Sequence, residues 1–254
     1  MADWNETQRS QQNVGSVPRS GRNLEEGMTF DEGLRKHMLG VYNYMASAVL
    51  LTAVVSMIMA RSGLVDFLVD PVAGPSLLYW ASVALPFVLV MWLQFRIFKM
   101  SVFAAQVSFW TYAVLTGISI SFIFLLYTPV SIAQTFFATA AAFAGLSLWG
   151  YTTKKDMSGW GSFLIMGIWG MFAATLLNVL VFESGMFDLI ASAIMIVLFS
   201  AFTAYKTQET KNIYMQLQGN AEMLKRATIY GALHLYMAFI AIFMNLLRFM
   251  GSND

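Results

Sequence analysis

Lys206 directly follows an apolar run, AIMIVLFSAFTAY (193–205), with no proline, glycine or turn signal before it. Ionisable side chains inside a membrane are costly and usually have a function. One interpretation is that Lys206 snorkels to the membrane surface and pairs with Glu209 one helical turn later. The other is that its ammonium group faces the interior of a helix bundle and lines a pathway. The two interpretations imply different functions.

Four more polar residues lie in or beside apolar segments. His234, in GALHLYMAFIAIF, is either a ring that titrates near neutral pH or an interfacial histidine hydrogen-bonded to a neighbouring helix. Arg96 ends the second apolar segment, where it either snorkels or is a buried cation that fixes a helix. We expect the amides of Asn178 and Asn245 to form hydrogen bonds between helices.

The residue types that enzymes use for catalysis do not come together in this sequence. His37 and His234 are far apart, and neither has a second metal ligand three or four residues away. None of the 14 acidic residues falls inside a predicted membrane span. The sequence has no phosphate-binding loop, G-x-S-x-G elbow or H-E-x-x-H motif. We therefore predict a protein that is not an enzyme, with no catalytic residues, metal site or cofactor.

The composition is typical of an integral membrane protein. Hydrophobic residues make up 58% of the chain and charged residues 11%, and the mean hydropathy is +0.62. So little charge could not cover the surface of a soluble domain of this length. The net charge of +1 gives no indication of a nucleic-acid partner.

Seven apolar segments are each long enough to cross a bilayer, which takes about 20 helical residues. The predicted spans are 38–60, 77–97, 103–127, 131–151, 160–182, 186–206 and 228–250. The last could also re-enter the membrane without crossing it. We predict an all-α seven-helix bundle over residues 36–251. The polar segment 1–35 is predicted to be a disordered tail.

The distribution of basic residues predicts the orientation. With seven spans, 13 of the 15 lysines and arginines fall on one side, and only Arg61 and Arg248 fall on the other. Because lysine and arginine are retained on the cytoplasmic side, we predict a cytoplasmic N-terminus.

Small residues recur at four-residue spacing in the fourth segment, where Ala140 precedes Ala144 and Ala141 precedes Gly145. Such faces let helices approach closely. We therefore expect this helix to lie inside the bundle.

Six stretches, taken in chain order, carry a resemblance to a known family. They are LRKHMLGVYNYMASAVLLTAVV (34–55), FRIFKMS (95–101), LTGISISFIFLLYTP (115–129), GYTTKKDMSGWGSFLIMGIWGMF (150–172), FTAYKTQETKNI (202–213) and ALHLYMAFIAIFMNLLRFMG (232–251). Together they resemble the Bax inhibitor-1 family of seven-helix membrane proteins. Its bacterial branch includes the modulator of the membrane-anchored AAA protease. The resemblance covers roughly residues 34–251.

The resemblance implies six helices around a central last helix and, in members with the full site, a pH-sensitive calcium leak. That leak is attributed to two facing aspartates with an arginine nearby. The aspartates fall at Lys206 and Ala238 here, and Arg96 is the candidate for the arginine. A lysine and an alanine cannot share a proton or hold a divalent cation. At an effective dielectric constant near 20, an ammonium group 4 Å from Ca²⁺ costs about 8 kcal/mol.

Two functions from different classes remain open. We favour a non-catalytic regulator of membrane protein quality control or of a stress response, since the predicted spans contain no acid. It would sit in the bacterial inner membrane and contact a membrane-anchored AAA protease or another membrane complex. The alternative is a pH-sensitive ion leak channel or transporter, in which Lys206 and His234 favour an anion, a neutral solute or a proton-linked step. This alternative predicts that Lys206 faces the bundle interior near His234.

Overall fold

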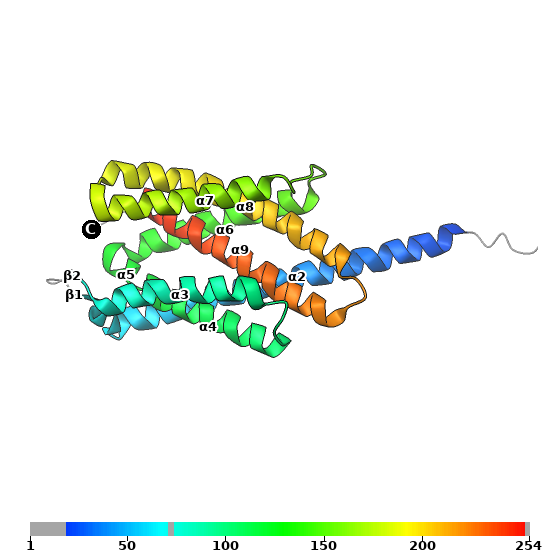
Figure 1. The fold of residues 1–254 in the computed structure, drawn as a ribbon, viewed down its shortest axis with the longest axis horizontal. Coiled ribbons are helices and arrows are strands. Elements are labelled where there is room, and N and C mark those ends of the chain that lie inside the picture. Colours follow the sequence, from blue (N-terminus) through cyan, green and yellow to red (C-terminus); the bar gives the residue numbers. More distant parts are fainter. Residues whose placement is uncertain (1–18, 71–73, 252–254) are drawn as a thin grey trace, which may run out of the picture.

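The computed structural model describes residues 19–70 and 74–251 as a bundle of long helices (Figure 1). The helices are α2 (Arg19–Arg61), α3 (Leu77–Arg96), α4 (Val102–Ile120), α5 (Ile123–Leu126), α6 (Pro129–Thr152), α7 (Trp160–Leu177), α8 (Gly185–Gln216) and α9 (Ala221–Met250). Between α2 and α3 lie a short helix, η1 (Leu64–Phe67), and an antiparallel pair of two-residue strands, β1 (Val69–Asp70) and β2 (Gly74–Pro75). A π-helical turn, η2 (Asn178–Phe182), ends α7.

The predicted all-α seven-span architecture is confirmed. In the described part of the chain seven helical stretches are long and apolar enough to cross a membrane, the third formed by α4 and α5 together. Most boundaries agree with the prediction within a few residues. The largest difference at a C-terminal end is in α8, which continues to Gln216, ten residues past the predicted end at Lys206.

Capping side chains fix where several helices begin. The hydroxyl groups of Ser76, Ser101, Thr128 and Ser184 each accept a hydrogen bond from a backbone N–H in the first turn of α3, α4, α6 and α8. Such a cap satisfies one of the N–H groups that have no partner within the helix. The tight turn from α8 to α9 contains Gly219 at φ +92°, a conformation that glycine adopts without strain.

The N-terminal segment differs in part from the expected tail. Residues 1–18 lie outside the described residues, whereas residues 19–35 are helical and continue into the first span. This part of α2 projects beyond the rest of the bundle in Figure 1. Its packing begins at Leu34, which is buried against Met38 of the same helix and Tyr214 of α8. Gly33 is needed there, because a Cβ at that position would lie 2.1 Å from the Tyr214 hydroxyl.

The last helix is central, as the family resemblance implies. In its most apolar stretch 67% of α9 is buried, against 11–39% for the other six spans. Phe239 packs its ring 5.7 Å from Phe136 and 5.6 Å from Phe143, both on α6. The helix runs without a break for 30 residues, about 45 Å at 1.5 Å per residue, which is the length of a crossing helix rather than of a re-entrant one.

The expectation for α6 is wrong about which face is inside. Ala141, Ala144 and Gly145 are exposed, whereas the opposite face, with a run of serine and threonine residues, is buried. The close approach that small residues were expected to provide occurs at Gly150, where a Cβ would lie 2.4 Å from the Ala204 carbonyl oxygen of α8. Spacing alone did not distinguish these faces, because both repeat about every four residues.

The connections α3–α4, α6–α7 and α8–α9 lie at the same end of the bundle as the start of the first span. This end contains Arg35, Lys99, Lys154 and Lys225, all exposed, and we call it the basic end.

Candidate functional site: a buried ion pair near the basic end

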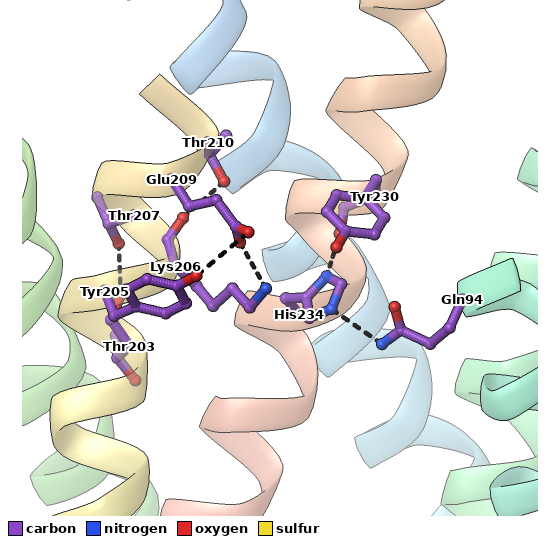
Figure 2. Close-up of polar contacts among 9 residues, drawn as sticks. All are labelled: Gln94, Thr203, Tyr205, Lys206, Thr207, Glu209, Thr210, Tyr230 and His234. Carbon is purple, nitrogen blue, oxygen red and sulfur yellow. Dashed lines mark hydrogen bonds and ion pairs between the residues drawn. The ribbon is translucent and has the colours of Figure 1, made fainter. Parts of the chain in front are cut away.

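Lys206 lies inside the bundle, on the part of α8 near the basic end (Figure 2). The residue is 5% exposed, and its Nζ is 2.5 Å from Oε2 of Glu209. The pairing agrees with the surface interpretation of Lys206. Its burial beside His234 agrees with the pathway interpretation. The extension of α8 past Lys206 accounts for the pairing, because it adds a further turn that carries Glu209.

Three aromatic rings surround the ammonium group of Lys206. Its Nζ lies 5.5 Å from the ring centre of Phe202, 5.3 Å from that of Tyr205 and 5.7 Å from that of Tyr230. Cation–π attraction replaces part of the hydration that a buried cation loses. Tyr205 also lies with its hydroxyl 3.5 Å from the second carboxylate oxygen of Glu209. We call Lys206, Glu209 and these three rings the latch.

The hydrogen bonds of His234 define its tautomer. Its Nδ1 is 2.9 Å from the Tyr230 carbonyl oxygen, which can only accept, so Nδ1 carries the proton. Its Nε2 is 2.9 Å from Nε2 of Gln94 and accepts from that amide. The ring is therefore neutral in this arrangement, and a second proton on Nε2 would require the Gln94 amide to turn over.

Gln94 of α3, rather than Arg96, reaches this site (Figure 2). Arg96 lies in the last turn of α3 with its side chain exposed, as the snorkelling interpretation predicts. Gln94 is missing from the site residues predicted from the sequence. A signal was available, because Gln94 is the one amide side chain in the segment 77–96, and an amide in a membrane span usually bonds to another helix.

Ala238 lies in an apolar layer next to the latch. It is fully buried and packs with Leu164, Phe199, Phe202 and Ile242. The carboxylate of this region therefore comes from Glu209, not from the positions of the family's aspartates. Nowhere in the described residues do three or more His, Cys, Asp or Glu side chains gather in a way that could hold a metal ion.

The two asparagines behave differently. Asn178 donates from Nδ2 to Oδ1 of Asp188 at 2.9 Å and accepts from the Ser184 backbone N–H at 3.1 Å, so it joins the end of α7 to the start of α8. Asn245 donates to the Ala241 carbonyl oxygen at 2.8 Å within α9. The expected bond between helices is thus observed for Asn178, while the described bond of Asn245 stays inside its own helix.

Gln208 holds the α6–α7 connection against the latch. Its side-chain oxygen accepts from the Met157 N–H and its amide nitrogen donates to the Lys155 carbonyl, both at 2.8 Å. Within that connection the Asp156 carboxylate accepts from the N–H and the hydroxyl of Ser158, which lowers the pKa of Asp156. The start of α7 then packs on Tyr205, where a Cβ at Gly161 would lie 2.5 Å from the tyrosine hydroxyl.

Fold and site together define a seven-helix membrane bundle with a central last helix and buried ionisable residues near one end. The chain belongs to the Bax inhibitor-1 family, since the family model described as inhibitor of apoptosis-promoting Bax1 matches residues 34–254.

Bacterial relatives cover nearly the whole chain. An uncharacterized protein of Rickettsia prowazekii is 38% identical over 225 residues, which is 89% of this chain and 93% of the relative. An uncharacterized protein of Caulobacter vibrioides is 39% identical over 231 residues, 89% and 92% of the two chains. The inner membrane protein YbhL of Escherichia coli is 37% identical over 223 residues, 87% and 93%.

Proposed function

We propose that this chain forms a gated pathway for small anions through the membrane, closed near its basic end by the latch, and that it does not conduct calcium. The observation that supports this proposal is the position of Lys206, which is buried in the bundle interior beside His234. The sequence favours the regulator because the predicted spans contain no acid, whereas α8 carries Glu209 within its length.

The two partners of the ion pair differ in exposure, which suggests how the latch opens. The Lys206 side chain is 6% exposed and that of Glu209 is 28% exposed. Glu209 can therefore turn toward water while Lys206 stays among its three rings. Opening would leave an uncompensated cation in the pathway, which attracts anions.

The same cation excludes calcium. With an effective dielectric constant near 20, an ammonium group and a calcium ion 4 Å apart repel by about 8 kcal/mol. No carboxylate other than Glu209 is described near Lys206 to offset this repulsion. We therefore expect selectivity opposite to that implied by the family's paired aspartates.

Chloride flux from proteoliposomes tests the proposal. Glu209→Gln removes the compensating charge, so chloride flux should rise about tenfold, within the range by which local fields raise ion association. Lys206→Gln should reduce flux to the level of protein-free liposomes. Glu222→Gln is the matched control, since Glu222 pairs with Arg226 at the same end but is 65% exposed in its side chain. Equal chloride flux in all four proteins would contradict the proposal.

We also propose an inner-membrane location with a cytoplasmic N-terminus. The Escherichia coli relative is named an inner membrane protein, and 13 of the 15 basic residues fall on the side of the N-terminus. Labelling a cysteine introduced at Lys154, on the exposed α6–α7 connection, from the periplasmic side of cells would contradict this orientation.

A regulatory role is a second candidate, favoured by the part of α2 that projects beyond the bundle (Figure 1). A helix outside the membrane offers a surface to a partner such as a membrane-anchored AAA protease. Deleting residues 1–31, ahead of the first span at Glu32, should then abolish co-purification with the protease and leave chloride flux unchanged. Retained co-purification would contradict this role for the segment.

A further inference from the structure

Buried hydroxyl groups recur along α6 and α8, and one pair of them, Ser147 and Thr207, meets where the two helices pack together. We call this set the hydroxyl seam. It consists of Ser131, Thr135, Thr139 and Ser147 on α6 and of Ser192, Thr203 and Thr207 on α8, each at most 8% exposed. Apolar residues would pack such an interface at lower desolvation cost. The seam therefore suggests that the interface has another role.

The contacts between α6 and α8 align the two rows of hydroxyls. Gly150 of α6 meets Ala204 of α8, and the Thr207 and Ser147 hydroxyl oxygens lie 3.5 Å apart. The chain runs along α6, returns along α7 and runs forward again along α8, so α6 and α8 point in the same direction. Counting back from Gly150 and Ala204 at 1.5 Å per residue places Thr135 about 22 Å and Ser192 about 18 Å along their helices. The buried hydroxyls thus extend along most of both helices, with Phe143 of α6, which packs on Phe239 of α9, lying between Thr139 and Ser147.

One member of the hydroxyl seam has no partner. Ser192 is fully buried, and its Oγ finds no hydrogen-bond partner among the described residues. It lies 11 residues before Thr203, which is three helical turns plus about 20°, so both face the same side of α8. An unsatisfied buried hydroxyl costs about 1–3 kcal/mol, whereas a water molecule at this point would satisfy it.

The threonines of the seam can accept further hydrogen bonds. Thr139, Thr203 and Thr207 each donate to the carbonyl oxygen four residues earlier at 2.8 Å. Each hydroxyl oxygen keeps lone pairs that accept from water, and each O–H can rotate from the carbonyl to an anion. The seam reaches the latch at the turn of α8 that holds Thr203, Lys206 and Thr207 (Figure 2).

We infer that the hydroxyl seam admits water and small anions, and that it connects the latch with the opposite face of the membrane. This inference rests on the proposed anion pathway and assigns its route to the α6–α8 interface. On this inference, the contacts of α9 with α2 and α4 hold the bundle together and do not line the route. In that part of the bundle Thr52 donates to the Ala113 carbonyl oxygen at 2.9 Å and lies 2.7 Å from the Tyr236 hydroxyl, while the buried Ser56 hydroxyl has no partner among the described residues.

Cysteine accessibility tests the route, and the chain offers a clean background because it contains no cysteine. Single Ser192→Cys and Thr139→Cys variants would be made in the Glu209→Gln background and reconstituted in liposomes. The probe is the anionic thiol reagent 2-sulfonatoethyl methanethiosulfonate. Ala113→Cys is the matched control at another interface with the same zero exposure, and Ala142→Cys is the control on the exposed face of α6.

Both seam cysteines should react at least about tenfold faster than Ala113→Cys and Ala142→Cys, as expected for a hydrated site compared with a closed or lipid-facing one. Reaction at the rate of Ala113→Cys in both seam variants would overturn the inference. Chloride flux in the same liposomes separates the two claims. Flux without labelling would overturn the route alone, whereas labelling without flux would support a hydrated seam and contradict the anion pathway. Elution as a single peak in size-exclusion chromatography shows that each variant is folded.

Discussion

Two ion pairs of nearly the same spacing lie near the basic end, and they differ in what surrounds them. Lys206 and Glu209 are three residues apart on α8, with side chains 6% and 28% exposed. Arg226 and Glu222 are four residues apart on α9, with side chains 16% and 65% exposed. Both pairs are typical helix-surface spacings. The difference shows that spacing predicts the partner, while the neighbouring helices decide whether the pair is a surface contact or a buried charge.

The largest expected effect comes from removing one carboxylate of the buried pair. Glu209→Gln should destabilise the protein by about 3 kcal/mol, because it leaves the Lys206 ammonium group buried without its counter-charge. Glu222→Gln should change stability by less than about 0.5 kcal/mol. Thermal unfolding in detergent, followed by circular dichroism, measures both. Equal losses of stability in the two variants would contradict the conclusion that the neighbouring helices make the two ion pairs different.

A smaller loss is expected at Gln94. Gln94→Leu removes the hydrogen-bond donor to Nε2 of His234, and a buried acceptor without a partner costs about 1–3 kcal/mol. Arg96→Leu is the matched control two residues later, and its exposed side chain should make it neutral within about 0.5 kcal/mol. Chemical denaturation of the two variants compares them directly. A larger loss for Arg96→Leu would indicate that the arginine belongs to the site after all.

Replacing the cation should cost less than replacing its partner. Lys206→Met removes the buried charge and leaves Glu209, which is partly exposed and can turn to water. We expect a loss of about 1 kcal/mol or less, since apolar replacement of buried charges is often tolerated. The same unfolding assay measures this loss. If Lys206→Met is as damaging as Glu209→Gln, Glu209 is held as rigidly as Lys206 and does not act as the moving part of the latch.

Two glycines of α7 differ in what surrounds them, and the smallest expected effects come from replacing each with alanine. Gly161→Ala places a Cβ 2.5 Å from the Tyr205 hydroxyl and should destabilise by about 1 kcal/mol as the ring moves away from Glu209. Gly170→Ala meets no atom within 4 Å and should stabilise the helix by about 0.5–1 kcal/mol. Melting temperatures that shift in the same direction for both variants would argue against a tight contact at Tyr205.

Much of the fold could be predicted from the sequence, because lipid requires long apolar helices and hydropathy measures that requirement. The end of α8 could not, since helix formation beyond the bilayer depends on packing. Residues past Lys206 stay helical because Gln208 bonds to the α6–α7 connection and Tyr214 packs on α2.

The site was predicted only in part. Spacing correctly paired Lys206 with Glu209, since side chains one turn apart are neighbours on a helix. It could not show that α9 would bring His234 and Tyr230 against that pair, nor which of Gln94 and Arg96 would point inward. Those outcomes depend on the rotation of each helix in the bundle, which apolar composition on all faces leaves undetermined.

The most direct test of the account is ion selectivity measured in one set of proteoliposomes, with chloride and calcium flux recorded for the unmodified chain and for a Lys206→Asp, Ala238→Asp double variant. We predict that the unmodified chain passes chloride and not calcium, and that the double variant passes calcium, because two carboxylates then replace the buried cation. Calcium flux through the unmodified chain would contradict the central claim, since it would place the conducting route away from Lys206.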